Sequence, residues 1–135
     1  MQRCNDSNCR KELVARRFGE MMVTHDFAAF LPLLHDDVSY ESDTAGVSLS
    51  SKFDLMRHLR ACLDAWRRRD EMKNLNFLLS SIEWQGNRHP CTVACQNGEL
   101  ISATVFDLRD NRVSAIHSLS CDVLDSLSKI DEARG

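Results

Sequence analysis

The sequence predicts one α+β domain, in which a curved sheet wraps around three N-terminal helices. The sheet is expected to be antiparallel except at its first strand. Apolar residues recur with a helical period before residue 67, and the period becomes strand-like from Leu75 onward. A chain of 135 residues is long enough to fold as one domain that buries roughly two thirds of its unfolded surface.

Three helices are expected in the first half of the chain. The first presents one apolar face that also carries a histidine, made of Val14, Phe18, Met21, Met22 and His25. Asp26 is a capping residue for a short second helix that Pro32 would end. Ser51 and Asp54 form a weak capping box for the third helix, whose apolar face comprises Leu55, Leu59, Cys62, Leu63 and Trp66. We expect His25 and His58 to lie at helix surfaces or edges.

The second half of the chain reads as hairpin-linked strands. Residues 37–42 are expected to form a brief first strand, and residues 43–49 a loop. Further strands are expected at 75–84, 90–96, 99–109 and 112–120. The Asn97-Gly98 pair favours a tight type I′ turn.

Composition narrows the function classes. The formal net charge of −3, from 17 basic and 20 acidic residues, gives no general attraction to nucleic acid or to anionic membranes. The chain has no apolar run long enough to span a bilayer, and its first residues lack a signal-peptide core, so we expect a cytoplasmic protein. The domain is expected over 10–122, between a ragged N-terminus (1–9) and a polar C-terminal tail (123–135).

The sequence contains no recognisable cofactor or metal motif. Six cysteines include no Cys-x-x-Cys pair, and a phosphate-binding loop and a dinucleotide fingerprint are both missing. We therefore expect no cofactor, no metal site and free thiols, with Cys95 as a possible small apolar residue of a cavity.

The order of elements resembles the NTF2-like superfamily, which includes the SnoaL-like cyclases and the ketosteroid isomerases. The resemblance rests on two helices, the segment Leu34-His-Asp-Asp-Val-Ser-Tyr-Glu-Ser42, a loop, the 51–66 helix and the antiparallel strands, over about residues 10–122. It implies an NTF2-like cone, in which ligands lie between the helices and the concave face of the sheet. It also implies homodimers that associate through the outer sheet face.

The same resemblance weakens the case for an enzyme of the isomerase type. Those isomerases use a carboxylate base at the end of the first strand, and the matching position here is Ser42, whose hydroxyl is far too weakly basic. Glu41 would need a shifted register to point inward. The weak catalytic candidates are Tyr40, Glu41, Asp107 and His117; Asp107 is either a pocket acid or half of an ion pair at a hairpin end.

The residues expected to contact a ligand follow from strand parity and from the resemblance. Tyr40 and Ser42 share one face of the first strand. Matching the family's last strand turns Ile116, Ser118 and Ser120 inward and turns His117 toward the outer face. Adding an aromatic residue of the third helix gives the ligand-binding candidates Tyr40, Ser42, Trp66, Ile116, Ser118 and Ser120.

The function expected from the sequence is a homodimeric pocket protein that binds a small apolar or amphipathic molecule. One alternative is a SnoaL-like isomerase, cyclase or hydratase that uses a pocket carboxylate. The other is an interaction module whose pocket is filled by its own side chains. An inward carboxylate or histidine would favour the enzyme, and an open volume of about 300 Å³ or more would favour binding.

Overall fold

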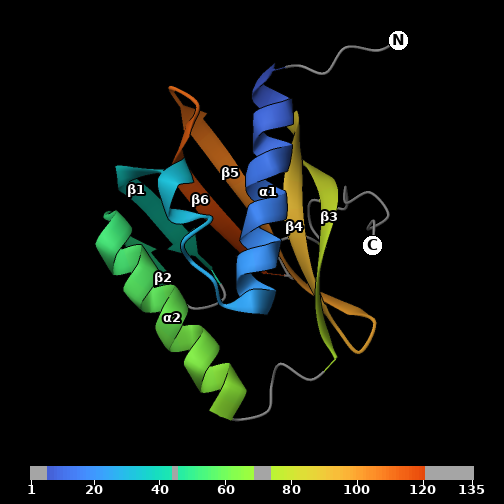
Figure 1. The fold of residues 1–135 in the computed structure, drawn as a ribbon. Coiled ribbons are helices and arrows are strands. Elements are labelled where there is room, and N and C mark those ends of the chain that lie inside the picture. The colour runs from blue at the N-terminus through green and yellow to red at the C-terminus, as the bar shows by residue number, and fades with distance from the viewer. Residues whose placement is uncertain (1–5, 44–45, 69–73, 121–135) are drawn as a thin grey trace.

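A computed structural model of the chain describes residues 6–43, 46–68 and 74–120 and confirms the α+β fold (Figure 1). In chain order the elements are α1 (Asp6–Thr24), the 3₁₀ helix η1 (Leu31–Leu33), β1 (Leu34–Ser42), β2 (Val47–Leu49), α2 (Lys52–Arg68), β3 (Leu75–Trp84), β4 (Asn87–Gln96), β5 (Glu99–Arg109) and β6 (Arg112–Ser120). The expected C-terminal tail, the end of the expected domain at 122 and residues 1–5 lie outside the described residues.

Two strands begin earlier than expected, β1 at Leu34 instead of residue 37 and β4 at Asn87 instead of residue 90. Two other expectations about elements are wrong. The described residues form two α-helices instead of three, because the segment after Asp26 makes a turn and then the three-residue η1. Asp26 Oδ1 accepts a hydrogen bond from Ala28 N at 3.0 Å, and Pro32 prevents a longer helix. The segment expected as a loop contains β2, which pairs antiparallel with the end of β1.

The six strands form one sheet in the order β2-β1-β6-β5-β4-β3. β1 runs parallel to β6, and every other neighbouring pair is antiparallel, so the mixed pairing expected at the first strand is confirmed. The turn Asn97-Gly98 has φ values of 54° and 81°, the positive pair that a type I′ hairpin requires.

Both helices cover the same face of the sheet, but they cover different parts of it. The main strand contacts of α1 are with β3, β4 and β5, and those of α2 are with β1. Phe18 of α1 packs edge-on against Phe30 and Phe106, with ring centroids 5.6 and 5.5 Å away. These rings anchor α1 to the concave face.

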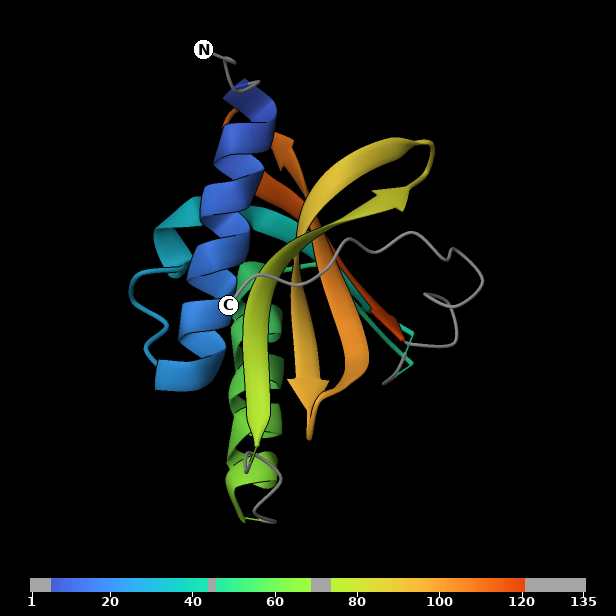
Figure 2. The ribbon, with the colours of Figure 1, turned by 90° about the vertical axis from the view of Figure 1, so that its right-hand side faces the viewer.

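The sheet curls strongly toward its outer face at the β3–β4 hairpin. Trp84 of β3 and His117 of β6 are three strands apart, which is about 14 Å in a flat sheet. Their ring centroids are only 4.6 Å apart. Figure 2 shows the tip of this hairpin bending away from the helices. The curl helps to enclose an outer apolar cluster that includes Ile82, Val93 and Val105, each fully buried.

Two polar contacts involve the histidines that lie against Trp84: one joins β6 to β5, and the other joins β4 to α1. His117 Nε2 lies 3.1 Å from Asp107 Oδ2, and Lys11 Nζ lies 3.2 Å from His89 Nδ1. The hydrogen bond from His117 lowers the pKa of Asp107 despite partial burial. Burial, reinforced by Lys11, lowers the pKa of His89, so His89 is neutral at physiological pH.

The remaining expectations concern membranes and cysteines. None of the described helices is long and apolar enough to cross a membrane. Cys62, Cys91 and Cys95 are free, as expected. The expectation is wrong for Cys9, which is disulfide-bonded. Cys4 and Cys121 lie outside the described residues.

We expect the free energy of unfolding to decrease as the pH falls below about 6.5, the ordinary histidine pKa. In that range His89 becomes protonated in the unfolded chain. In the folded chain, where its pKa is lowered, it stays neutral. The unfolded state therefore binds more protons and gains stability. The substitution His89→Gln should make the pH slope between 7.5 and 5.5 shallower, as measured by urea unfolding. A slope identical to that of the wild type would contradict this assignment. Part of the pH slope that remains in the His89→Gln variant should come from His58, because burial lowers its pKa as well.

Candidate functional site

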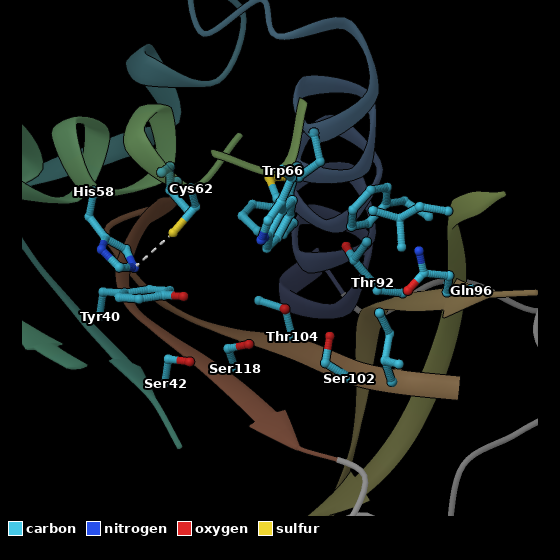
Figure 3. A pocket seen from close by; sticks show the side chains of 17 residues that line it. Tyr40, Ser42, His58, Cys62, Trp66, Thr92, Gln96, Ser102, Thr104 and Ser118 are labelled. Carbon is cyan, nitrogen blue, oxygen red and sulfur yellow. Dashed lines mark hydrogen bonds between the residues drawn. The ribbon is translucent and has the colours of Figure 1, made fainter. Parts of the chain in front are cut away.

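A cavity of about 310 Å³ lies where the two helices and the concave face of the sheet meet (Figure 3). Its apolar wall comes mainly from α1, α2 and β3, through Phe18, Met22, Leu59, Trp66 and Phe77. Its polar wall comes mainly from β1, β5 and β6, through the hydroxyls of Tyr40, Ser42, Ser102, Thr104 and Ser118. The cavity thus has one side suited to an apolar body and another suited to hydrogen bonds.

Tyr40 is the centre of the polar side. Its side chain is buried, at 6% exposure, and burial raises the pKa of its hydroxyl, while side-chain hydrogen bonds from Ser42 and Ser118 act in the opposite direction. The phenol is therefore neutral at physiological pH, so it can donate a hydrogen bond. In Figure 3 its hydroxyl lies beside Ser42 and Ser118. This hydroxyl cluster is the best recognition site in the cavity for a carbonyl or hydroxyl oxygen.

His58 and Cys62 project from one face of α2 beside Tyr40. They are four residues apart, which places both on the same side of a helix. His58 Nε2 lies 3.6 Å from Cys62 Sγ, and the His58 ring is tilted against the Tyr40 ring with centroids 5.6 Å apart. Burial lowers the pKa of His58 and raises that of Cys62. At neutral pH the pair is therefore an imidazole beside a thiol, without net charge.

Of the two positions expected for His58, the helix surface or an edge, the structure has the second. His58 is half-buried and lines the cavity. The sequence contained one signal for this position: His58 and Cys62 share the helical spacing of the apolar face, with the same four-residue step as Leu55 and Leu59.

The four weak catalytic candidates are not gathered at the cavity. Tyr40 lines it. Glu41 is exposed, while Asp107 and His117 pair with each other on the outer face of the sheet. Among the described residues that line the cavity there is no Asp, Glu, Lys or Arg. The described part of the chain also holds no group of three or more His, Cys, Asp or Glu side chains placed to bind a metal ion.

Four of the six ligand-binding candidates line the cavity, namely Tyr40, Ser42, Trp66 and Ser118. The other two are placed elsewhere. Ile116 is fully buried in the core beneath the helices. Ser120 Oγ donates a hydrogen bond to Asp43 Oδ2 at 3.1 Å, at the end of β6. Cys95, named as a possible cavity residue, packs instead against the outer apolar cluster.

A register shift explains why strand parity did not identify the cavity face of β5. Cys95 pairs with Leu100 while Ala94 pairs with Ser102, so Ile101 is an extra residue in β5. Such a bulge places two successive residues toward one side of a strand. Ile101 and Ser102 accordingly both line the cavity. Before the bulge an even-numbered residue, Leu100, lies on the outer face, whereas after it the even-numbered Ser102 and Thr104 face the cavity.

Solved structures with the same fold come from several bacteria. A SnoaL-like protein of unknown function from Burkholderia thailandensis has a TM-score of 0.60 at 18% identity, over 87% of this chain and 98% of that one. A candidate polyketide cyclase from Xanthomonas campestris has a TM-score of 0.55 at 12% identity, over 92% and 98%. A candidate ketosteroid isomerase from Kribbella flavida has a TM-score of 0.55 at 15% identity, over 83% and 78%.

No protein-family model matches the sequence, and no curated protein does so either. The likeness is therefore one of fold, at identities too low to carry an activity across. The chain has the NTF2-like fold that its order of elements predicts, with a cavity between the helices and the concave sheet.

Proposed function

We propose that this protein binds a small, neutral, amphipathic molecule in the cavity. The observation that carries the proposal is the lining itself, with aromatic and aliphatic side chains facing a cluster of hydroxyl groups. A volume of about 310 Å³ falls at the lower end of the range for small-molecule pockets. The described lining residues include no permanently charged side chain, so a charged ligand would lose its hydration without gaining an ion pair.

The proposed orientation follows from the two sides of the cavity. The apolar body lies against Phe18, Trp66 and Phe77, and a carbonyl or hydroxyl oxygen meets Tyr40 and Ser118. Thr92 cannot donate to the ligand, because its Oγ1 already donates to the Ala15 carbonyl at 2.6 Å. One or two hydrogen bonds add only about 0.5–1.5 kcal/mol each. They orient the ligand, while burial of its apolar body supplies most of the binding free energy.

We expect 2-naphthol to bind and to be preferred over 2-naphthoate, which has the same ring system but carries a charge. Isothermal titration calorimetry measures both affinities. Tyr40→Phe should weaken 2-naphthol binding by about 3- to 10-fold, the equivalent of one hydrogen bond. Ser39→Ala is the control, because it removes a hydroxyl from the same strand outside the cavity, where Ser39 Oγ donates to the Ser114 carbonyl. Tighter binding of the naphthoate, or no binding of either compound to folded protein, would contradict the proposal.

An isomerase, cyclase or hydratase acting in the same cavity is the second candidate. His58 favours it, because this neutral imidazole beside Tyr40 supplies the base that Ser42 cannot. A base that removes a proton next to a carbonyl requires a donor for the enolate oxygen, and Tyr40 is such a donor.

If the second candidate holds, the protein should exchange the α-protons of 2-tetralone with deuterium in heavy water, and His58→Gln should slow the exchange by about a hundredfold or more. Proton NMR follows the exchange. Exchange at the buffer rate, with 2-tetralone shown to be bound, would leave the protein as a binding module.

The homodimer stays a proposal, and the outer sheet face is the surface we assign to it. Beside the buried outer cluster are three partly exposed apolar side chains, those of Leu78, Trp84 and Leu100. They form an apolar surface on which a second copy of the chain could pack. We expect light scattering to give about twice the mass of the 15.4 kDa chain at micromolar concentration, whereas a monomer would contradict the assignment. The cytoplasmic location expected from the sequence is likewise a proposal.

A further inference from the structure

We propose that the cavity forms a covalent adduct with an α,β-unsaturated carbonyl compound. In this adduct Cys62 is the nucleophile, His58 is the general base, and Tyr40 donates a hydrogen bond to the carbonyl oxygen. The inference deepens the proposed function and rests on it, because the same cavity must first bind the neutral ligand. It goes further by giving that ligand a reactive group.

The nucleophile and its base are in place. Cys62 is a free, half-buried thiol on the cavity wall. His58 Nε2 lies 3.6 Å from its Sγ, which is within the reach of a hydrogen bond to sulfur. Burial keeps the imidazole neutral at physiological pH by lowering its pKa, so the ring is free to accept the thiol proton.

A donor for the developing negative charge lies on the other side of the pair. The Tyr40 ring contacts the His58 ring, with a centroid distance of 5.6 Å, and Tyr40 and Cys62 both line the cavity. The hydroxyls of Ser42 and Ser118 lie beside the phenol and counteract the rise in its pKa. A carbonyl oxygen at this hydroxyl cluster places the conjugated carbon–carbon double bond beside the thiol.

The proposed reaction needs no further reagent. Cys62 Sγ attacks the β-carbon of the enone while its proton passes to His58 Nε2. The π electrons of the carbon–carbon bond move to the carbonyl oxygen, where Tyr40 stabilises the resulting enolate. The imidazolium then returns the proton to the α-carbon. One sulfur–carbon bond and one carbon–hydrogen bond form, and one S–H bond and one π bond are lost.

The resting pair should be selective for ligands that enter the cavity. Because burial raises the pKa of the Cys62 thiol, little thiolate is present at neutral pH, and a reagent in bulk solution meets a poor nucleophile. A bound enone removes this limitation, since His58 takes the proton as the sulfur attacks. A soft, neutral electrophile suits these surroundings, because it brings no charge that would need a counterion in the cavity.

The test uses cyclohex-2-enone on the intact protein at pH 7, followed by mass spectrometry and peptide mapping. Among the free cysteines of the described residues we expect an adduct on Cys62 alone, and no adduct with cyclohexanone, which lacks the double bond. Excess 2-naphthol should slow the labelling by occupying the cavity. Cys62→Ser should abolish this adduct. Cys95→Ser should leave it unchanged, because Cys95 is also free and half-buried but lies with the outer cluster.

The role of His58 is tested by the pH profile of labelling. In the wild type the rate should level off above the lowered pKa of His58. With His58→Gln it should fall by about a hundredfold at pH 7 and keep rising toward the raised pKa of the thiol. Circular dichroism confirms that the variant is folded. A profile unchanged by His58→Gln would overturn the role of the base.

The outcomes separate this inference from the proposed function. If 2-naphthol binds but cyclohex-2-enone leaves Cys62 unlabelled, the covalent step is wrong and the binding function stands. Labelling that 2-naphthol does not slow, or that falls equally on Cys95, would overturn the inference by showing unselective thiol chemistry. If neither compound interacts with folded protein, both proposals fail.

Discussion

The cavity depends on how the two helices divide one concave face of the sheet. α1 is anchored over β3, β4 and β5, while α2 lies over β1 at the other side. Phe18, held between Phe30 and Phe106, fixes the position of α1. Because the sheet curves, two straight helices cannot both follow it closely, and side chains do not fill the whole space between them. The remaining volume is the cavity of about 310 Å³.

The chemistry of that space follows from which residues face it. Hydroxyl groups of β1, β5 and β6 face the cavity from the concave side of the sheet, with Tyr40, Ser42 and Ser118 grouped together. Charged side chains of the described residues lie away from the cavity. They are on exposed helix faces, as in the Arg57–Asp54 pair, or on the strands outside the cavity, as in the Asp107–His117 pair. The pocket is therefore polar but neutral, which sets the class of ligand that we propose.

The sequence predicted the fold well where local rules are strong. The boundaries of β3, β5 and β6 agree with the predicted ones, because tight turns such as Asn97-Gly98 impose positive φ angles that few other residue types accept. The third expected helix, α2, begins as expected, with Asp54 N donating to Ser51 Oγ at 3.1 Å. The prediction of a short second α-helix was wrong. Pro32 follows Asp26 so closely that the segment between them forms a turn and a 3₁₀ helix instead.

The site was predictable only in part. Period-two alternation correctly placed Tyr40 and Ser42 on one face, but it cannot anticipate a bulge, so the faces of β5 around Ile101 were ambiguous. The contact of His58 with Tyr40 joins α2 to β1, and nothing in the local sequence encodes that contact between two separate elements. The partnership of Asp107 with His117 likewise depends on the register of β5 against β6.

The most direct test of the central claim is a methyl NMR titration with 2-naphthol, because neighbouring residues of the sheet face opposite sides. Ala94 and Thr104 line the cavity, whereas Ala103 and Val105 belong to the outer cluster. Occupancy of the cavity predicts large chemical-shift changes for the methyl groups of Ala94 and Thr104 and small ones for Ala103 and Val105. The reverse pattern would place the ligand on the outer face and contradict the account.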